Sequence, residues 1–396
     1  MDSVRNPFAP GAGNQPPELS GRDDILSAAD IALQRILLQR HAKSQILLGL
    51  RGTGKTVLLR KLESMAEAHG YKTSFIEAPE DKTLPQLIYP RVHQVLRKLS
   101  IIETAKQKVR SALQALHSFV GTFQVNVGED ISISVDPELG TADSGILEYD
   151  LSELFIRVGE AAKAANQGWA FFIDEVQYLS SEDLSAMIVA IHHVNQKNLP
   201  VIFFGAGLPQ VAALTGDAKS YAERLFDYPT VDALNLESAI SAIKHPIIEE
   251  EESIEEGALQ AIFEKTKGYP FFLQEWGYQA WDIADASPIN KDDVERATSF
   301  ALKRLDEGFF RVRLDRLTPK EQKYVFAMAE LGEGSYRCSD VAEKLGESTQ
   351  KLGTCRAQII NKGMIYSPAH GDIAFTVPMF EEYLKRIQNS GIENSE

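Results

Sequence analysis

Short segments with the character of buried strands alternate with longer segments of helical periodicity through the first half of the chain. The strand-like segments cover residues 45–48, 72–77, 169–173 and 201–204, and most of their positions are apolar. Before and between them, apolar residues recur at the spacing of one helix face, as from Ile25 to Ile36. Apolar strands that alternate with helices are typical of a mainly parallel sheet covered by helices on both sides. The pattern therefore predicts an α/β fold.

The pattern changes twice after residue 234. Four helical stretches fill residues 237–314 without a strand between them, and beyond Thr318-Pro319 short helices lead to a hairpin around residues 368–371. A further hairpin is predicted at 123–135. We therefore predict an extended arm at 1–20, an α/β domain at 21–235 with inserted helices and hairpin at about 84–145, a helical domain with a connecting helix at 236–316, a C-terminal domain at 317–388 and a disordered tail at 389–396.

A complete phosphate-binding loop follows the first strand-like segment. The loop consists of Gly49, Leu50, Arg51, Gly52, Thr53, Gly54, Lys55 and Thr56, and a helix continues from Val57. Its glycines let backbone N–H groups turn toward phosphate oxygens, and the helix N-terminus adds partial positive charge. Lys55 would reach the β- and γ-phosphates, and the Thr56 hydroxyl would hold Mg²⁺. Arg51 occupies a variable position that we expect to face solvent. The loop predicts a P-loop NTPase.

The apolar segment 169–173 supplies the partner that such a loop needs, because it ends in Asp174-Glu175. Asp174 would hold Mg²⁺, and Glu175 would act as general base toward the attacking water. The long interval between Lys55 and Asp174 is filled by the insertion at 84–145. We expect no Asn-Lys-x-Asp segment to read a guanine base, as a GTPase would need.

The composition excludes other classes of protein. In 396 residues no apolar run approaches the ~20 needed to span a bilayer, so no membrane partner is expected. The first residues lack an apolar signal-peptide core, and Cys338 and Cys355 match neither a disulfide framework nor a zinc pattern. These observations favour a cytoplasmic location. The net charge of −15 argues against a surface coated in nucleic acid.

Taken together, these motifs resemble those of AAA+ ATPases, in particular the STAND-like and origin-recognition-like ATPases of prokaryotes. Residues 6–8 and 17–23 resemble the N-terminal segment that lies against the adenine in this family, and residues 268–277 resemble its lid motif. The resemblance implies ATP and Mg²⁺ as ligands, a helical lid at 236–316 with Pro270 near the nucleotide, and an arginine finger at Arg224. Arg224 is equally compatible with a surface arginine paired to a neighbouring acid.

Two departures from the family pattern argue against fast hydrolysis. The strand at 201–204 runs into Gly205-Ala206-Gly207-Leu208-Pro209, where many relatives carry a polar sensor side chain, and the lid motif lacks an arginine. We therefore expect a slow ATPase that acts as a nucleotide-dependent switch rather than a motor. A nucleotide-binding scaffold with negligible hydrolysis is the alternative.

The helices and hairpin of residues 317–388 resemble a winged helix-turn-helix. Its third helix would enter the major groove of double-stranded DNA, and the candidate contacts are Lys351, Arg356, Lys362 and, at the wing tip, His370. Residues 318–396 carry nine Lys and Arg against eleven Asp and Glu, which weakens the case for DNA. The alternative partner is a protein: the chain's own ATPase domain, another protein or a second copy in a homo-oligomer.

Overall fold

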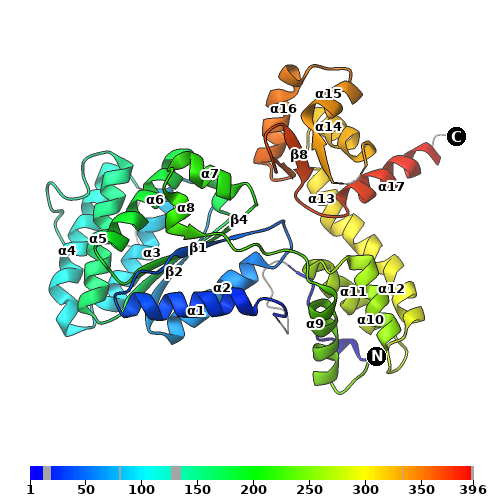
Figure 1. Ribbon diagram of the computed structural model, residues 1–396, viewed down its shortest axis with the longest axis horizontal. Coiled ribbons are helices and arrows are strands. Elements are labelled where there is room, and N and C mark those ends of the chain that lie inside the picture. Colours follow the sequence, from blue (N-terminus) through cyan, green and yellow to red (C-terminus); the bar gives the residue numbers. More distant parts are fainter. Residues whose placement is uncertain (12–18, 80–81, 126–134, 333, 394–396) are drawn as a thin grey trace. The chain divides into compact units, whose positions relative to one another are not determined.

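The computed structural model describes residues 1–11, 19–79, 82–125, 135–332 and 334–393, and it divides into two compact units (Figure 1). The sheet unit comprises Arg22–Gly49 and Lys55–Val231, and the helical unit comprises Met1–Gly21, Leu50–Gly54 and Asp232–Glu396. The middle of the predicted phosphate loop therefore groups with the helical unit, although the chain on either side of it belongs to the sheet unit.

A parallel sheet of five strands in the order β2-β3-β4-β1-β5 forms the centre of the sheet unit. The strands are β1 (Ser44–Leu48), β2 (Tyr71–Glu77), β3 (Gly168–Asp174), β4 (Val201–Gly207) and β5 (Phe226–Asp227). The predicted α/β fold with a mainly parallel sheet is confirmed. Strand β5 was not predicted, because two residues are too short to carry a periodic pattern.

Helices cover both faces of this sheet (Figure 1). On one face, α1 and α2 share a core with Leu47, Phe172 and Phe204; on the other, α3 to α6 share a core with Phe171 and Phe203. Neighbouring residues of one strand serve opposite cores because successive side chains alternate. The helices are α1 (Asp23–Leu37), α2 (Lys55–Ala68), α3 (Leu84–Leu99), α4 (Lys106–Thr122), α5 (Leu147–Ala164), α6 (Ser181–Gln196), α7 (Val211–Ala218) and α8 (Ala222–Leu225).

The carboxyl edge of the sheet is where polar side chains gather. Every residue of β1, β3 and β4 is buried, and the charged residue among them, Asp174, is the last residue of β3. The register pairs Leu48 with Gly207 and Ile173 with Gly205, which brings the ends of the three strands to one edge. Ligand sites in open α/β sheets form at this edge.

Four helices in the helical unit confirm the helical stretches predicted for residues 237–314: α9 (Leu236–Glu249), α10 (Glu256–Thr266), α11 (Pro270–Ile283) and α12 (Lys291–Arg304). Helix α12 continues through the π-helical segment η4 (Leu305–Phe310) into α13 (Arg311–Leu314). The first residues of the predicted arm, which include η1 (Ser3–Arg5), join this core. Phe8 is 2% exposed, and the Trp281 indole N–H donates to the Asp2 carbonyl at 2.9 Å.

Residues 319–393, which we call the C-terminal module, contain α14 (Pro319–Glu330), α15 (Cys338–Lys344), α16 (Thr349–Asn361) and α17 (Phe380–Glu393). An antiparallel sheet joins β6 (Ser335–Arg337), β8 (Asp372–Phe375) and β7 (Ile365–Tyr366) in that order. The expected three helices and hairpin are present, whereas β6 and α17 were not predicted.

The C-terminal tail and residues 123–135 differ from the sequence predictions or fall outside what the structure describes. Helix α17 extends to Glu393, into the tail predicted to be disordered from residue 389. The prediction missed this helix because tertiary contacts hold it: Tyr383 stacks on Phe310, and Arg386 pairs with Asp306 at 2.6 Å. The hairpin predicted at 123–135 falls mainly on residues 126–134, outside the described part of the chain, and residues 123–125 follow α4 without forming a strand.

No helix among the described residues is long and apolar enough to cross a membrane.

Gly168→Ala should destabilise the sheet unit by about 1–3 kcal/mol, because the added methyl group would overpack the core against the Tyr71 ring. An added Cβ would lie 2.2 Å from the buried Tyr71 ring, whose hydroxyl is held by the Leu33 carbonyl at 2.7 Å. Gly216→Ala, in α7 with open space around the added methyl group, is the control and should be neutral or slightly stabilising. Equal thermal midpoints for the two variants would contradict this packing argument.

Candidate nucleotide-binding site

The turn from β1 into α2 is built by two glycines in the left-handed region of backbone conformation. Gly52 has φ 84° and Gly54 has φ 91°, angles that side-chain-bearing residues rarely adopt. Gly49, at the start of the loop, continues the sheet ladder through its N–H, which donates to the Gly207 carbonyl at 3.1 Å. Lys55 is the first residue of α2, so the loop ends at a helix N-terminus. This is the backbone form expected of a phosphate cradle.

Three side chains meet where the loop approaches the end of β3. The Lys55 ammonium group donates to the Gly49 carbonyl at 2.8 Å, and the residue is 7% exposed. The Thr56 hydroxyl donates to Asp174 Oδ2 at 2.6 Å. The other Asp174 oxygen, Oδ1, accepts from the Glu175 N–H at 2.9 Å. The structure thus brings Lys55, Thr56 and Asp174 together, as the sequence predicted.

Asp174 is a buried carboxylate, 3% exposed. Burial raises its pKa, and the neighbouring Glu175 charge adds to that effect; the Thr56 hydrogen bond and the Lys55 charge oppose it without cancelling it. A cation would offset this desolvated charge. The oxygen donors of Thr56 and Asp174 fit Mg²⁺, which prefers hard oxygen ligands and retains water and phosphate oxygens in its remaining positions.

Glu175 follows Asp174 in an unusual backbone conformation, with φ 55° and ψ 43°. This left-handed conformation is sparsely populated by residues other than glycine, and such residues cluster at functional sites. Its carboxylate Oε2 accepts a hydrogen bond from the side-chain amide of Gln177, in the short helix η3 (Val176–Tyr178). Sequence reasoning did not identify Gln177.

The middle of the loop contacts the helical unit, to which it belongs. The Gly52 carbonyl accepts from the N–H of Phe271, which follows Pro270 at the start of α11, at 3.2 Å. The Arg51 N–H donates to the Thr376 carbonyl of the C-terminal module at 3.0 Å.

Arg51 does not simply face solvent as predicted: its Nε atom is buried. Burial lowers the pKa of the Arg313 guanidinium to about 10, and the nearby charge of Arg51 contributes to this shift. The residue as a whole is half-buried, because packing within the helical unit, which local sequence does not reveal, covers part of its side chain.

The remaining candidates of the sheet unit lie in regular elements. Val57 is half-buried in the first turn of α2. Arg224 is exposed on the short helix α8. Burial lowers the pKa of His192 on α6, and the charges of His193 and Arg224 lower it further. Arg224 therefore lies close to His192.

The four candidate DNA contacts differ in their availability. Lys351 is exposed, with Glu347 at 3.8 Å, and His370 is exposed in the turn between β7 and β8. Arg356 is half-buried. Lys362 is engaged within the module: its ammonium group donates to Glu321 at 2.7 Å and to the Arg316 carbonyl at 2.9 Å. We therefore withdraw Lys362 as a DNA contact.

Lys362 has a structural role instead. Burial raises the pKa of Glu321, but hydrogen bonds from Lys362 and Thr318 outweigh it, and the net pKa lies below the usual value. Glu321 and Thr318 form the capping box that opens α14.

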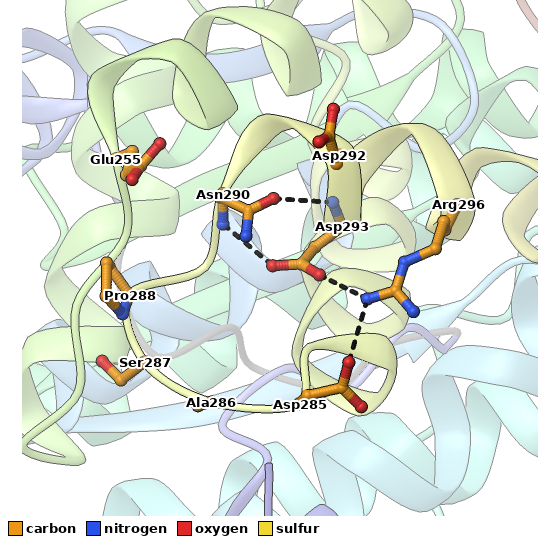
Figure 2. Close-up of a pocket in the computed structure, with 9 residues that line it drawn as sticks. All are labelled: Glu255, Asp285, Ala286, Ser287, Pro288, Asn290, Asp292, Asp293 and Arg296. Carbon is orange, nitrogen blue, oxygen red and sulfur yellow. Dashed lines mark hydrogen bonds and ion pairs between the residues drawn. The ribbon is translucent and has the colours of Figure 1, made fainter.

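Contrary to our expectation, the chain does contain an Asn-Lys-x-Asp pattern, at residues 290–293. Asn290, Asp292 and Asp293 of this pattern line an open cavity of about 550 Å³ in the helical unit (Figure 2). Its polar groups are used locally. Asn290 and Asp293 form the capping box of α12, and Arg296 pairs with Asp293 at 2.5 Å and with Asp285 at 3.5 Å. The segment starts a helix, and each of the two motif side chains accepts a hydrogen bond from the backbone N–H of the other residue.

Comparisons with known proteins agree with this architecture. Residues 18–204 match the family model of the AAA ATPase domain, and residues 307–384 match a domain of unknown function, DUF8462. No curated protein matches the chain. The first match supports an AAA+ P-loop ATPase domain in the N-terminal half.

Solved structures resemble nearly the whole chain. The Walker-type ATPase PABY2304 of Pyrococcus abyssi is 15% identical with a TM-score of 0.53, over 93% of this chain and 96% of that one. The Orc1 protein of Aeropyrum pernix, solved in complex with DNA, is 13% identical with a TM-score of 0.48, over 96% of each chain. The RuvB Holliday junction branch migration motor of Thermotoga maritima is 16% identical with a TM-score of 0.45, over 94% and 98%. At these identities the likeness to PABY2304 shows the fold alone.

Asp174→Asn should raise the thermal midpoint of the ligand-free protein near neutral pH. The folded-state pKa of Asp174 lies above the ordinary 3.8, so its contribution to stability is present at low pH and is lost as pH rises through the folded pKa. Removing the charge should add about 1 kcal/mol, or roughly 2–4 °C, at neutral pH. The difference from wild type should shrink toward pH 4.

The Asp174→Asn variant should also lose the stabilisation that nucleotide and metal give to the wild-type protein. Thermal unfolding across pH 4–8, with and without Mg-ATP, measures this loss together with the stability gain of the ligand-free variant. Asp217→Asn on the exposed side of α7 is the control and should behave as wild type. A variant that is less stable than wild type by the same margin at every pH would refute the argument.

Proposed function

We propose that this chain is an ATP- and Mg²⁺-binding switch with slow ATP hydrolysis. The hydrogen bond between Thr56 and Asp174 carries the proposal, because it brings together the two oxygen donors that would share a metal ion. The match of residues 18–204 to the AAA ATPase domain supports it independently. Bound Mg²⁺ would supply charge neutralisation for the phosphates.

In this proposal, separate residues of the chain bind the phosphates and accept the proton of the attacking water. Gly49, Lys55, Val57 and the loop residues Leu50–Gly54 surround the phosphates, with Lys55 contributing the positive charge. Glu175 accepts a proton from the attacking water. Pro270 would lie near the nucleotide, and Arg224, exposed on α8, would act on nucleotide held by a neighbouring copy in an oligomer.

The switch itself would depend on the loop residues 50–54. The Arg51 N–H already donates to Thr376 of the C-terminal module, and the Gly52 carbonyl accepts from Phe271 of α11. A ligand that reorganises the loop must disturb these bonds, so nucleotide binding would change how the C-terminal module and α11 are held. This arrangement supports a regulatory ATPase whose C-terminal module contacts its own chain.

Lys55→Ala should reduce ATP affinity by at least 10-fold, since it removes the buried positive charge of the loop. Lys61→Ala, exposed on the same helix, should leave it unchanged. Glu175→Gln should bind ATP as wild type does and lower phosphate release at least 100-fold. Titration with a fluorescent ATP analogue and a phosphate-release assay measure the two quantities. Equal ATP affinity in the two lysine variants would overturn the assignment of this loop.

A second candidate function is binding of double-stranded DNA through the C-terminal module, which we propose to be a winged helix. Its three helices and antiparallel hairpin favour this interpretation, and α16 exposes Lys351, Thr354 and Gln358. With Lys362 engaged, few cations remain on this helix, so any affinity should be modest.

Binding of labelled duplex DNA at several salt concentrations, with and without ATP, tests this second function. A DNA-binding module should lose affinity as salt rises, and Lys351→Ala should reduce the salt slope by about 1, whereas Lys323→Ala on α14 should not. His370→Ala should weaken binding if the wing tip contacts the duplex. No salt-dependent binding in either nucleotide state would eliminate DNA as the partner and leave protein.

A further inference from the structure

The end of β4 lacks a polar side chain, and the side chain of Gln177 occupies the adjacent space. The strand closes with Gly205, Ala206 and Gly207. A Cβ added to Gly207 would lie 2.8 Å from Gln177 Oε1 and 2.7 Å from Val211. Gly207 does not have a left-handed backbone, so its lack of a side chain provides room rather than conformational freedom. Because Gly207 has no side chain, it leaves room at the end of β4 for the polar side chain of Gln177, which belongs to η3.

The hydrogen-bond partners determine which way the Gln177 amide points. The Leu208 backbone N–H can only donate, and it lies 3.1 Å from Gln177 Oε1. The amide nitrogen must then face the opposite direction, where it donates to Glu175 Oε2. Both the oxygen and the nitrogen of the Gln177 amide thus form hydrogen bonds, and Glu175 Oε1 has no hydrogen-bond partner among the residues that the structure describes.

The Gln177 side chain connects the chain segments that follow strands β3 and β4. Glu175 comes directly after β3, whereas Leu208 comes directly after β4. Val176, which lies between Glu175 and Gln177 in the sequence, is 1% exposed, so it anchors the start of η3 in the core. The half-buried Glu175 carboxylate therefore accepts its hydrogen bond from a residue of an anchored segment.

We propose that Gln177 is a positioning residue for ATP hydrolysis, holding the Glu175 carboxylate against the end of β4 in place of the polar side chain that this strand lacks. This inference rests on the proposed ATPase function. A general base must lie within hydrogen-bond reach of the water whose proton it accepts, and small displacements cost large factors in rate. Gln177 touches no reacting atom in this role.

Gln177→Leu, of similar size, removes both hydrogen bonds and should lower the turnover number for ATP at least 10-fold while changing the KM for ATP less than 2-fold. A structural defect would instead lower the thermal midpoint and alter nucleotide binding together. In the Glu175→Gln background, Gln177→Leu should have little further effect on turnover, because the group that it positions is already gone.

Gln177→Glu tests whether Gln177 acts by positioning Glu175 or only by holding the Leu208 backbone. The variant keeps an oxygen that can accept from the Leu208 N–H, but it places a second carboxyl group against Glu175. Its turnover should be low near neutral pH and should recover relative to wild type as pH falls, when the introduced carboxyl group is protonated and can donate. A pH profile parallel to that of wild type would contradict the proposal.

The outcomes separate this inference from the function on which it rests. Absence of ATP turnover in the wild-type chain would refute the proposed hydrolysis itself. Wild-type turnover that depends on Glu175 but is unchanged, or increased, in Gln177→Leu would refute the positioning role and leave the ATPase intact.

Discussion

The buried carboxylate of Asp174 is the constraint around which the candidate site is arranged. It stands at the end of a strand whose seven residues are all buried, so its charge has lost most of its water. Each oxygen is compensated by one donor, the Thr56 hydroxyl or the Glu175 N–H, and Lys55 adds an opposite charge. These groups lower the pKa of Asp174, but burial outweighs them and the pKa stays above its usual value, so a nearby cation would offset a charge that is costly to bury.

The phosphate loop divides its contacts between the two units of the chain. Gly49 and Lys55 belong to the sheet unit, and their backbone and side chain are tied to the ends of β1 and β4. Residues 50–54 belong to the helical unit and use their backbone groups on Phe271 and Thr376. One short segment thus has the backbone form of a phosphate cradle and also makes hydrogen bonds to residues far away in the sequence.

A polar group can reach the end of a strand from a neighbouring element when the strand itself carries none. The sequence from Gly205 to Leu208 indicates only that β4 ends without a polar group. In the folded chain the missing volume at Gly207 is filled by the amide of Gln177, which reaches Glu175. The spacing of Glu175 and Gln177 was visible in the sequence, but no periodic or chemical signal singled out Gln177 from other polar residues on short helices.

Local features of the sequence determined the strands β1 to β4, most of the helices, the glycine-rich turn and the Asp174-Glu175 pair, because periodicity and backbone preference act over a few residues. Tertiary structure alone decided the use of individual polar groups. Lys362, which seemed free for DNA, is held by Glu321, and Asn290 and Asp293 of a guanine-reading pattern cap a helix instead. Helix α17 and the buried Arg51 Nε likewise depend on residues far apart in the chain, whose proximity no local pattern encodes.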